Sequence, residues 1–205
     1  MAGKSHCRLT ILQASAASRR GLIQALGAQM TLLEIVDKFL DRSVSEGINC
    51  LPMPIPADMA TGQVQDDWNY WIPIDSKVTD SKLKQLETEI GLILSPQYKS
   101  ILQHRHFMSL QIQNVGFFKH PSVGWQESLK KEIFHGGPYE LLLGKGFLPF
   151  ADYSDWGLWC FSIKEQDSQG EYSVYLWDHD QPDKLEFVSG SLHSALIAEL
   201  SSGRT

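Results

Sequence analysis

The stretch from Phe147 to Asp180 constrains the fold more than any other part of the chain. In it, apolar side chains alternate with others on either side of a polar loop from Lys164 to Gly170. Because successive side chains of a strand point to opposite faces of a sheet, this alternation predicts two adjacent antiparallel strands. Trp159, Phe161 and Ile163 then share one side of the first strand. One face of the hairpin is expected to be core and the other only partly buried.

The ends of these two strands carry a cluster of carboxylates and large aromatic side chains. Such a rim suits the recognition of another protein, because aromatic rings supply buried area and carboxylates attract a basic partner. Asp and Ser also favour turns, so turn formation is the alternative explanation for any one of these residues. The predicted partner-binding residues are Asp152, Asp155, Trp156, Trp177, Asp178 and Asp180.

Acidic side chains are concentrated toward the C-terminal end of the chain. The formal net charge of the 205 residues is −6, yet residues 1–29 carry four basic side chains and no acidic one. From Phe150 onward there are ten acidic residues against three basic ones. We expect this end to repel nucleic acid and to attract a basic protein.

The chain divides into three parts by composition. Residues 1–29 are rich in Ala, Ser and Gln and are interpreted as an N-terminal extension, with Met30 as an alternative start of the folded chain. Residues 30–74 are predicted to contain a helix and a Pro-rich connector, because each proline restricts itself and its predecessor. Residues 75–205 are predicted to form the compact domain.

Capping residues and apolar spacing predict the individual elements. Thr31 followed by Glu34 has the spacing of a capping box, and Ser95-Pro96 is a typical helix start. Because helices do not alternate regularly with strands, we predict an α+β fold with a mostly antiparallel sheet flanked by helices and an N-terminal helical extension. Helices are predicted to begin near residues 31, 80, 96, 124 and 191, and strands are predicted at 106–118, 139–143 and 185–188, with a loop at 59–64.

Neither a membrane span nor a disulfide framework is predicted. No run approaches the ~18 apolar residues that a spanning helix needs. Cys7, Cys50 and Cys160 are odd in number and lack a CxxC spacing, for which a reducing cytoplasm is the simplest setting. His104 and His106 have the spacing of two ligands on one side of a strand, but no third ligand is near in sequence. No metal or other cofactor is expected.

Several common catalytic motifs are absent from the sequence. It has no phosphate-binding glycine loop, dinucleotide fingerprint or GxSxG turn. Adjacent residues of a strand point to opposite faces, so in the sequence Asp178-His179-Asp180 only the two carboxylates could act together. We therefore predict that the protein is not an enzyme. A hydrolase that uses Asp178 or Asp180 is retained as an alternative.

Three segments, taken together, resemble the SUKH superfamily, which includes Smi/Knr-like proteins. The first segment is a predicted helix pair that contains Leu-Lys-Gln-Leu-Glu-Thr-Glu-Ile-Gly and Leu-Ser-Pro-Gln-Tyr-Lys. The second is a predicted strand with Phe-Leu-Pro-Phe-Ala-Asp-Tyr-Ser-Asp-Trp-Gly. The third is Val-Tyr-Leu-Trp-Asp-His-Asp, which the closing helix follows. The resemblance covers about Asp75 to Leu200. The sequence departs from the family pattern at Tyr153 and Ser154, where an acidic residue or glycine is frequent.

The resemblance implies an α+β fold and binding without catalysis. The superfamily includes fungal regulators of cell-wall assembly and glucan synthesis, and bacterial immunity proteins that neutralise toxins, many of them nucleases. We accordingly predict an acidic, cytoplasmic immunity protein whose partner is a basic toxin domain. A regulatory scaffold of the cell-wall assembly type is the alternative. No binding to nucleic acid or membrane is expected, and the oligomeric state stays open.

Overall fold

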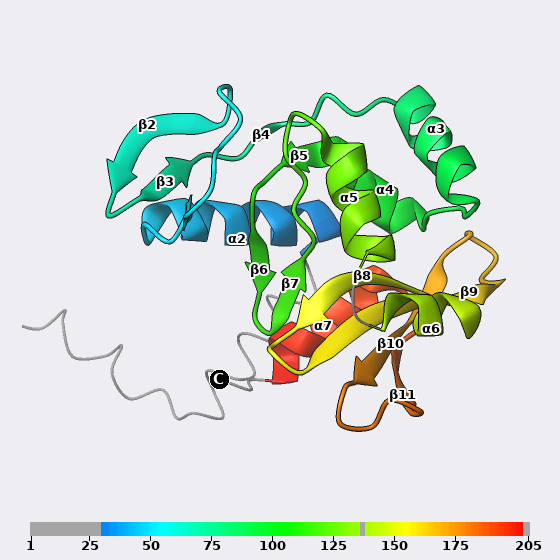
Figure 1. The fold of residues 1–205 in the computed structure, drawn as a ribbon. Coiled ribbons are helices and arrows are strands. Elements are labelled where there is room, and N and C mark those ends of the chain that lie inside the picture. Colours follow the sequence, from blue (N-terminus) through cyan, green and yellow to red (C-terminus); the bar gives the residue numbers. More distant parts are fainter. Residues whose placement is uncertain (1–29, 136–137, 203–205) are drawn as a thin grey trace, which may run out of the picture.

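A computed structural model describes residues 30–135 and 138–202. Within these residues the chain forms six helices and three antiparallel sheets (Figure 1), so the predicted α+β fold is confirmed. The interpretation of residues 1–29 as an extension lies outside the described residues. The helices are α2 (Leu32–Ser45), α3 (Asp80–Ile90), α4 (Pro96–His104), α5 (Trp125–Phe134), α6 (Tyr139–Gly144) and α7 (Leu192–Ser202).

The largest sheet has six strands in the order β11-β10-β9-β8-β7-β6. The predicted central hairpin is confirmed, because β9 and β10 pair antiparallel with Trp159 opposite Leu176. The polar loop is shorter than predicted, since β9 continues to Gln166. The strands are β6 (Leu110–Ile112), β7 (Val115–Phe117), β8 (Phe147–Tyr153), β9 (Gly157–Gln166), β10 (Tyr172–Asp178) and β11 (Leu185–Ser189).

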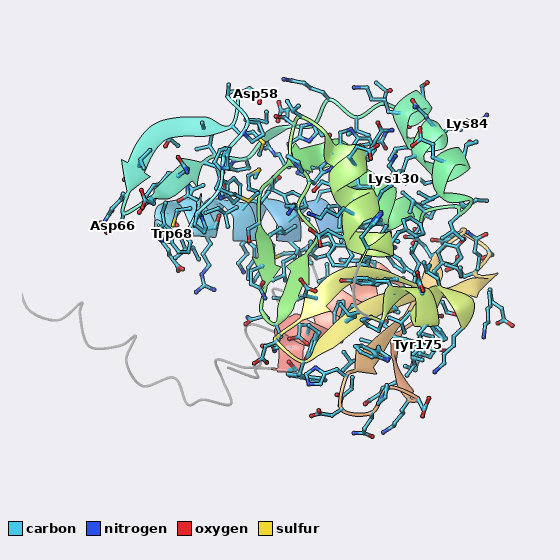
Figure 2. All side chains as sticks on the ribbon, viewed as in Figure 1. Asp58, Asp66, Trp68, Lys84, Lys130 and Tyr175 are labelled. Carbon is cyan, nitrogen blue, oxygen red and sulfur yellow. The ribbon has the colours of Figure 1, made fainter. Side chains whose placement is uncertain are left out.

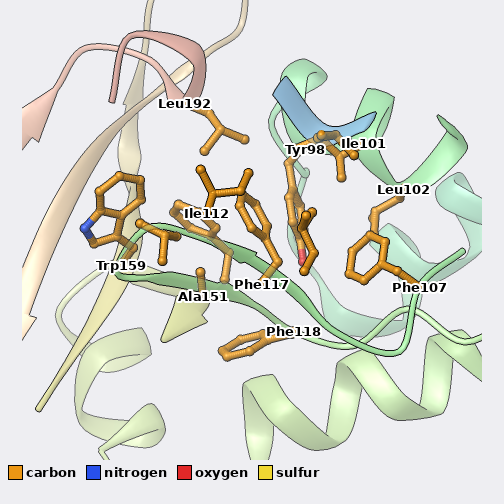
Figure 3. Close-up of a cluster of buried hydrophobic side chains, with 14 of the residues drawn as sticks. Tyr98, Ile101, Leu102, Phe107, Ile112, Phe117, Phe118, Ala151, Trp159 and Leu192 are labelled. Atoms are coloured by element: carbon orange, nitrogen blue, oxygen red, sulfur yellow. The ribbon is translucent and has the colours of Figure 1, made fainter. Parts of the chain in front are cut away.

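Each face of this sheet has its own buried cluster. On the first face, Trp159 and Phe161 belong to the main core, which also contains Leu192 of α7 and Tyr98 of α4. Figure 3 shows part of this core. On the second face, a smaller cluster consists of Leu142 of α6 with Leu158, Cys160 and Trp177. The second face of β9 is thus more buried than the sequence pattern indicated.

Two smaller sheets lie in the first half of the described chain. In one, the order is β1-β3-β2, and in the other β4 pairs with β5. The predicted loop at 59–64 is wrong, because β2 pairs with β3 across a turn at Asp66 and Asp67. Both have positive φ, 49° and 67°, as a two-residue type I′ hairpin turn requires. The strands are β1 (Cys50–Leu51), β2 (Ala60–Gln65), β3 (Trp68–Trp71), β4 (Ile74–Asp75) and β5 (Arg105–His106).

The predicted strand at 139–143 is also wrong, because these residues form helix α6. The helix begins directly after Pro138, whose fixed φ suits a helix start. The helix places Leu142 against the sheet with no exposed surface, while Leu141 is 46% exposed. The apolar run Leu141–Leu143 therefore has only one fully buried member.

Helix starts follow the capping residues that the sequence predicted. Thr31 and Glu34 form the expected capping box on α2. Ser95 caps α4, and a carboxylate distant in sequence adds to this cap. The Ser95 hydroxyl donates to Glu171 Oε2 at 2.6 Å, and the Gln97 backbone N–H donates to Glu171 Oε1 at 2.9 Å. The residue that precedes β10 therefore holds the start of α4.

Helix α2 packs against α4 and β6 (Figure 1). Its buried side chains Ile35, Val36 and Leu40 belong to the same cluster as Trp159 and Leu196. The segments predicted as residues 30–74 and 75–205 therefore contribute to one hydrophobic core.

Candidate functional site

The structure separates the six predicted partner-binding residues into three groups. Cross-strand pairing puts Asp152 and Trp177 on the second face of the sheet, because both lie opposite Leu158. Asp178 pairs with Gly157 and faces the other way, toward the first face. The other three residues lie in connections, with Asp155 and Trp156 between β8 and β9, and Asp180 between β10 and β11.

Trp156 and Asp178 meet at a shallow hollow on the first face, with a volume of about 70 Å³. Asp155 and Asp180 are exposed in the neighbouring turns. Among the described residues, neither Asp178 nor Glu186 has an ion pair. The hollow is lined by Trp156, Leu176, Asp178, Gln181, Lys184 and Glu186.

The turn that carries Trp156 is held on both sides. The Ser154 backbone N–H donates to the carbonyl of Asn114 at 2.7 Å, and the His179 N–H donates to the carbonyl of Trp156 at 3.1 Å. The rings of Tyr153 and Trp156 meet edge to face at 5.2 Å between centroids. At Gly157 a side chain would not fit, since a Cβ would lie 2.7 Å from the Trp177 carbonyl oxygen. These contacts position Trp156 at the edge of the hollow.

A buried carboxylate of α7, that of Glu199, forms hydrogen bonds with residues next to this turn. Glu199 Oε1 accepts from Asn114 Nδ2 at 2.8 Å, and Glu199 Oε2 accepts from the Tyr153 hydroxyl at 3.2 Å. Sequence reasoning missed Asn114 and Glu199, because their partners are 85 and 46 residues away. The one available signal was an acidic residue within the apolar repeat of the last helix.

Trp177, which the sequence predicted as a partner-binding residue of the rim, is buried. Its side chain is only 7% exposed and packs against Leu142, Leu158 and Cys160. Its Nε1–H donates to the carbonyl of Pro182 at 3.1 Å, within the β10–β11 connection. Trp177 therefore presents no ring face to a partner and instead stabilises the turn that carries Asp180.

Asp152 lies apart from the hollow, near α5 and α6. Partial desolvation, with a smaller contribution from Glu132, raises the pKa of the Asp152 carboxyl above its usual value. Burial raises the pKa of Tyr139 to about 12, and Asp152 and Glu132 contribute to this shift. Glu132 is itself paired with Lys119 at 3.2 Å. Asp152 therefore belongs to a different electrostatic environment from Asp178.

The other candidate chemical groups have structural partners. Asp178 Oδ1 accepts from the Asp180 backbone N–H at 2.8 Å, which closes the turn between them. His104 pairs with Asp37 at 2.9 Å, and the His106 ring is buried beside His120. Within residues 30–135 and 138–202, no three His, Cys, Asp or Glu side chains are grouped to hold a metal ion.

The length and apolar character of the described helices bear on whether one of them could cross a membrane. None of those in the described part of the chain has both the length and the apolar character to cross a membrane.

Comparison with known families supports the resemblance seen in the sequence motifs. A family model described as SMI1 / KNR4 family (SUKH-1) matches residues 77–197, which is more than half of the chain. The matched range includes the hollow and both turns at its rim, and it leaves α2 and the sheet β1-β3-β2 outside. A search of curated proteins finds no match.

Proposed function

We propose that this chain, which belongs to the SMI1 / KNR4 family (SUKH-1), is a protein-binding module without catalytic activity. We propose further that it acts in the cytoplasm as an immunity protein and neutralises a basic toxin domain. The observation that carries the proposal is the hollow in which Trp156 lies beside the carboxylates of Asp178 and Glu186.

A lysine or arginine side chain of the partner matches the chemistry of this hollow. A cation over the face of a tryptophan is attracted by the ring, by about 0.5–2 kcal/mol according to how far it is desolvated. Charge-assisted hydrogen bonds to Asp178 and Glu186 would add to this attraction. Asp155 and Asp180, both exposed at the rim, would accelerate the encounter with a positively charged surface.

A nuclease is a suitable kind of toxin partner. A nuclease needs basic side chains to hold phosphates, and an acidic protein competes for the same surface. The excess of acidic residues after Phe150 supports this choice of partner.

The test first seeks an open reading frame for a toxin-like domain beside this gene and then uses that domain as the binding partner. Binding is measured by titration calorimetry for the full chain and for Trp156→Ala and Asp178→Asn. Each substitution is expected to weaken binding about tenfold or more, because central aromatic and charged contacts carry most of the affinity of an interface. Asp66→Asn is the matched control, since Asp66 is an exposed acid at the far tip of the β2–β3 hairpin (Figure 2).

Unchanged affinity in Trp156→Ala and Asp178→Asn would exclude the hollow as the binding site. Absence of toxin binding, together with capture of wall-synthesis or signalling proteins, would favour the regulatory scaffold instead. Turnover of a substrate by the purified protein, lost in Asp178→Asn, would favour the hydrolase.

A further inference from the structure

A second pocket lies where the N-terminal segment meets the six-stranded sheet. Its volume is about 290 Å³, close to the lower end of the ~300–1,000 Å³ of small-molecule sites. It is separate from the Trp156 hollow and shares no lining residue with it. Its lining residues are Phe39, Arg42, Ser43, Ile48, Trp71, Ser109, Gln111 and Gln113.

The two walls of this pocket come from different parts of the chain. Helix α2 supplies Phe39, Arg42 and Ser43, which share one side of the helix because they are three and four residues apart. The opposite wall is β6 with its flanking residues, whose alternate side chains line the pocket while Leu110 and Ile112 are buried. Only this second wall belongs to the stretch matched by the family model.

Trp71 provides an independent sign of a ligand. The side chain lines the pocket and is 1% exposed, and its Nε1 is buried without a hydrogen-bond partner among the described residues. The backbone of Trp71 is held in place, because its N–H donates to the Asn49 carbonyl and Asn49 Nδ2 donates to the Trp71 carbonyl. A buried N–H without an acceptor costs free energy, so a ligand that brings an acceptor is favoured.

The remaining polar groups of the pocket also favour an acceptor. Among the residues that the structure describes, no carboxylate lines the pocket, and Arg42 is its one charged side chain. Arg42 forms an ion pair with Glu46, in which its Nε donates to Oε1 at 2.8 Å, and neither Nη group has a hydrogen bond within the described residues. The adjoining apolar surface includes Ile48, which is 62% exposed and would gain burial from an apolar ligand.

We propose that this pocket binds a carboxylate attached to an apolar group. The carboxylate accepts hydrogen bonds from Arg42 and, once the buried indole turns toward the pocket, from the Trp71 N–H, and the apolar group packs against Ile48 and Phe39. A small carboxylic acid and the C-terminal residue of a peptide share this chemistry. The site does not depend on the proposed toxin binding.

The test follows the indole N–H of Trp71 in the full-length, ¹⁵N-labelled protein by NMR, with the signal assigned through Trp71→Phe. N-acetyl-leucine represents the small acid, and a hexapeptide ending in leucine represents the chain terminus. We expect a saturable shift of the Trp71 signal with a Kd of about 1 mM, as ligands of this size usually reach. The amide of each probe is expected to bind at least tenfold more weakly.

Variants separate the pocket from a general effect of charge. Arg42→Gln is expected to weaken binding of the acids tenfold or more, and Ile48→Ser to weaken it severalfold. Lys38→Gln is the matched control, because Lys38 is an exposed cation of the same helix that does not line the pocket. Folding of each variant is verified from the dispersion of its NMR spectrum.

The two probes also distinguish the source of the carboxylate. Tighter binding of the hexapeptide identifies a peptide terminus, and equal binding identifies a small acid. The proposal is overturned if neither acid shifts the Trp71 signal in a saturable way. It is equally overturned if acid and amide bind alike, or if Lys38→Gln weakens binding as much as Arg42→Gln.

Discussion

Two tryptophans predicted for the same rim differ in what they do. Trp177 is buried in the small cluster of the second face, whereas Trp156 is partly exposed at the hollow. Trp177→Ala should therefore lower the free energy of unfolding by about 3–5 kcal/mol, as large-to-small changes in a core do. Trp156→Ala should lower it by about 1 kcal/mol, the usual size for a substitution at a partly exposed position. Urea denaturation followed by circular dichroism measures both values.

Equal losses in the two variants would contradict this assignment of Trp177 to the core. At this scale the sequence pattern predicted that Trp159 and Phe161 share one side of their strand, and both belong to the main core. Alternation could not predict that α6 would cover Trp177, because the same apolar leucines of α6 also fit a strand. The support of Tyr153 by Glu199 joins residues distant in sequence, and its one local signal was an acidic residue within the apolar repeat of the last helix.

At the scale of elements, Glu171 acts as a helix cap supplied from another part of the chain. Its buried carboxylate accepts from the Ser95 hydroxyl and the Gln97 N–H at the start of α4. Glu171→Gln removes the negative charge and one acceptor, so we expect the free energy of unfolding to fall by about 1–3 kcal/mol. Chemical denaturation measures the change, and Glu165→Gln, an exposed acid of β9, is the control.

A Glu171→Gln variant as stable as the Glu165→Gln control would show that the cap contributes little.

Elements with strong local signals, such as the capping box at Thr31, could be predicted from the sequence. The β2–β3 hairpin could not, because its turn is Asp66-Asp67 and lacks the glycine of the usual Asn-Gly or Asp-Gly signal. Its strand β2 is exposed throughout, so no apolar alternation marks it.

At the scale of the whole molecule, His106 and His120 form a buried, neutral pair that joins several segments. His106 Nε2 accepts from the Lys77 backbone N–H at 3.1 Å, and His106 Nδ1 lies 3.3 Å from the His120 carbonyl oxygen. His120 Nε2 lies 2.8 Å from the Leu102 carbonyl oxygen. Burial lowers the pKa of His106, and burial together with His106 lowers the pKa of His120 to about 3. Protonation of either ring therefore opposes folding.

The pair predicts a loss of stability in acid. An unfolded histidine has a pKa near 6.5, so stability is complete above about pH 6.5 and falls as the pH approaches the folded pKa. From His120 alone we expect a loss of about 2 kcal/mol between pH 8 and pH 5. Urea denaturation at both pH values measures it, and His120→Gln should reduce the difference by about that amount.

His135→Gln is the control for this experiment, because His135 is exposed. A pH dependence that His120→Gln leaves unchanged would assign the acid sensitivity to other groups. The charge of Asp58 raises the pKa of His106, whereas the charges of Lys77 and Lys82 lower it. These three groups therefore also affect how stability depends on pH.

The packing of α2 against β6 determines where the protein can be cut. Similarity to the family begins at residue 77, but burial does not stop there, since Ile35, Val36 and Met59 fill the same interior as Ile112 and Phe117. A fragment that starts at the similarity boundary would leave a strand edge and several leucine, isoleucine and phenylalanine side chains facing water. Such a fragment is expected to aggregate, so the smallest useful expression unit begins at or before Met30.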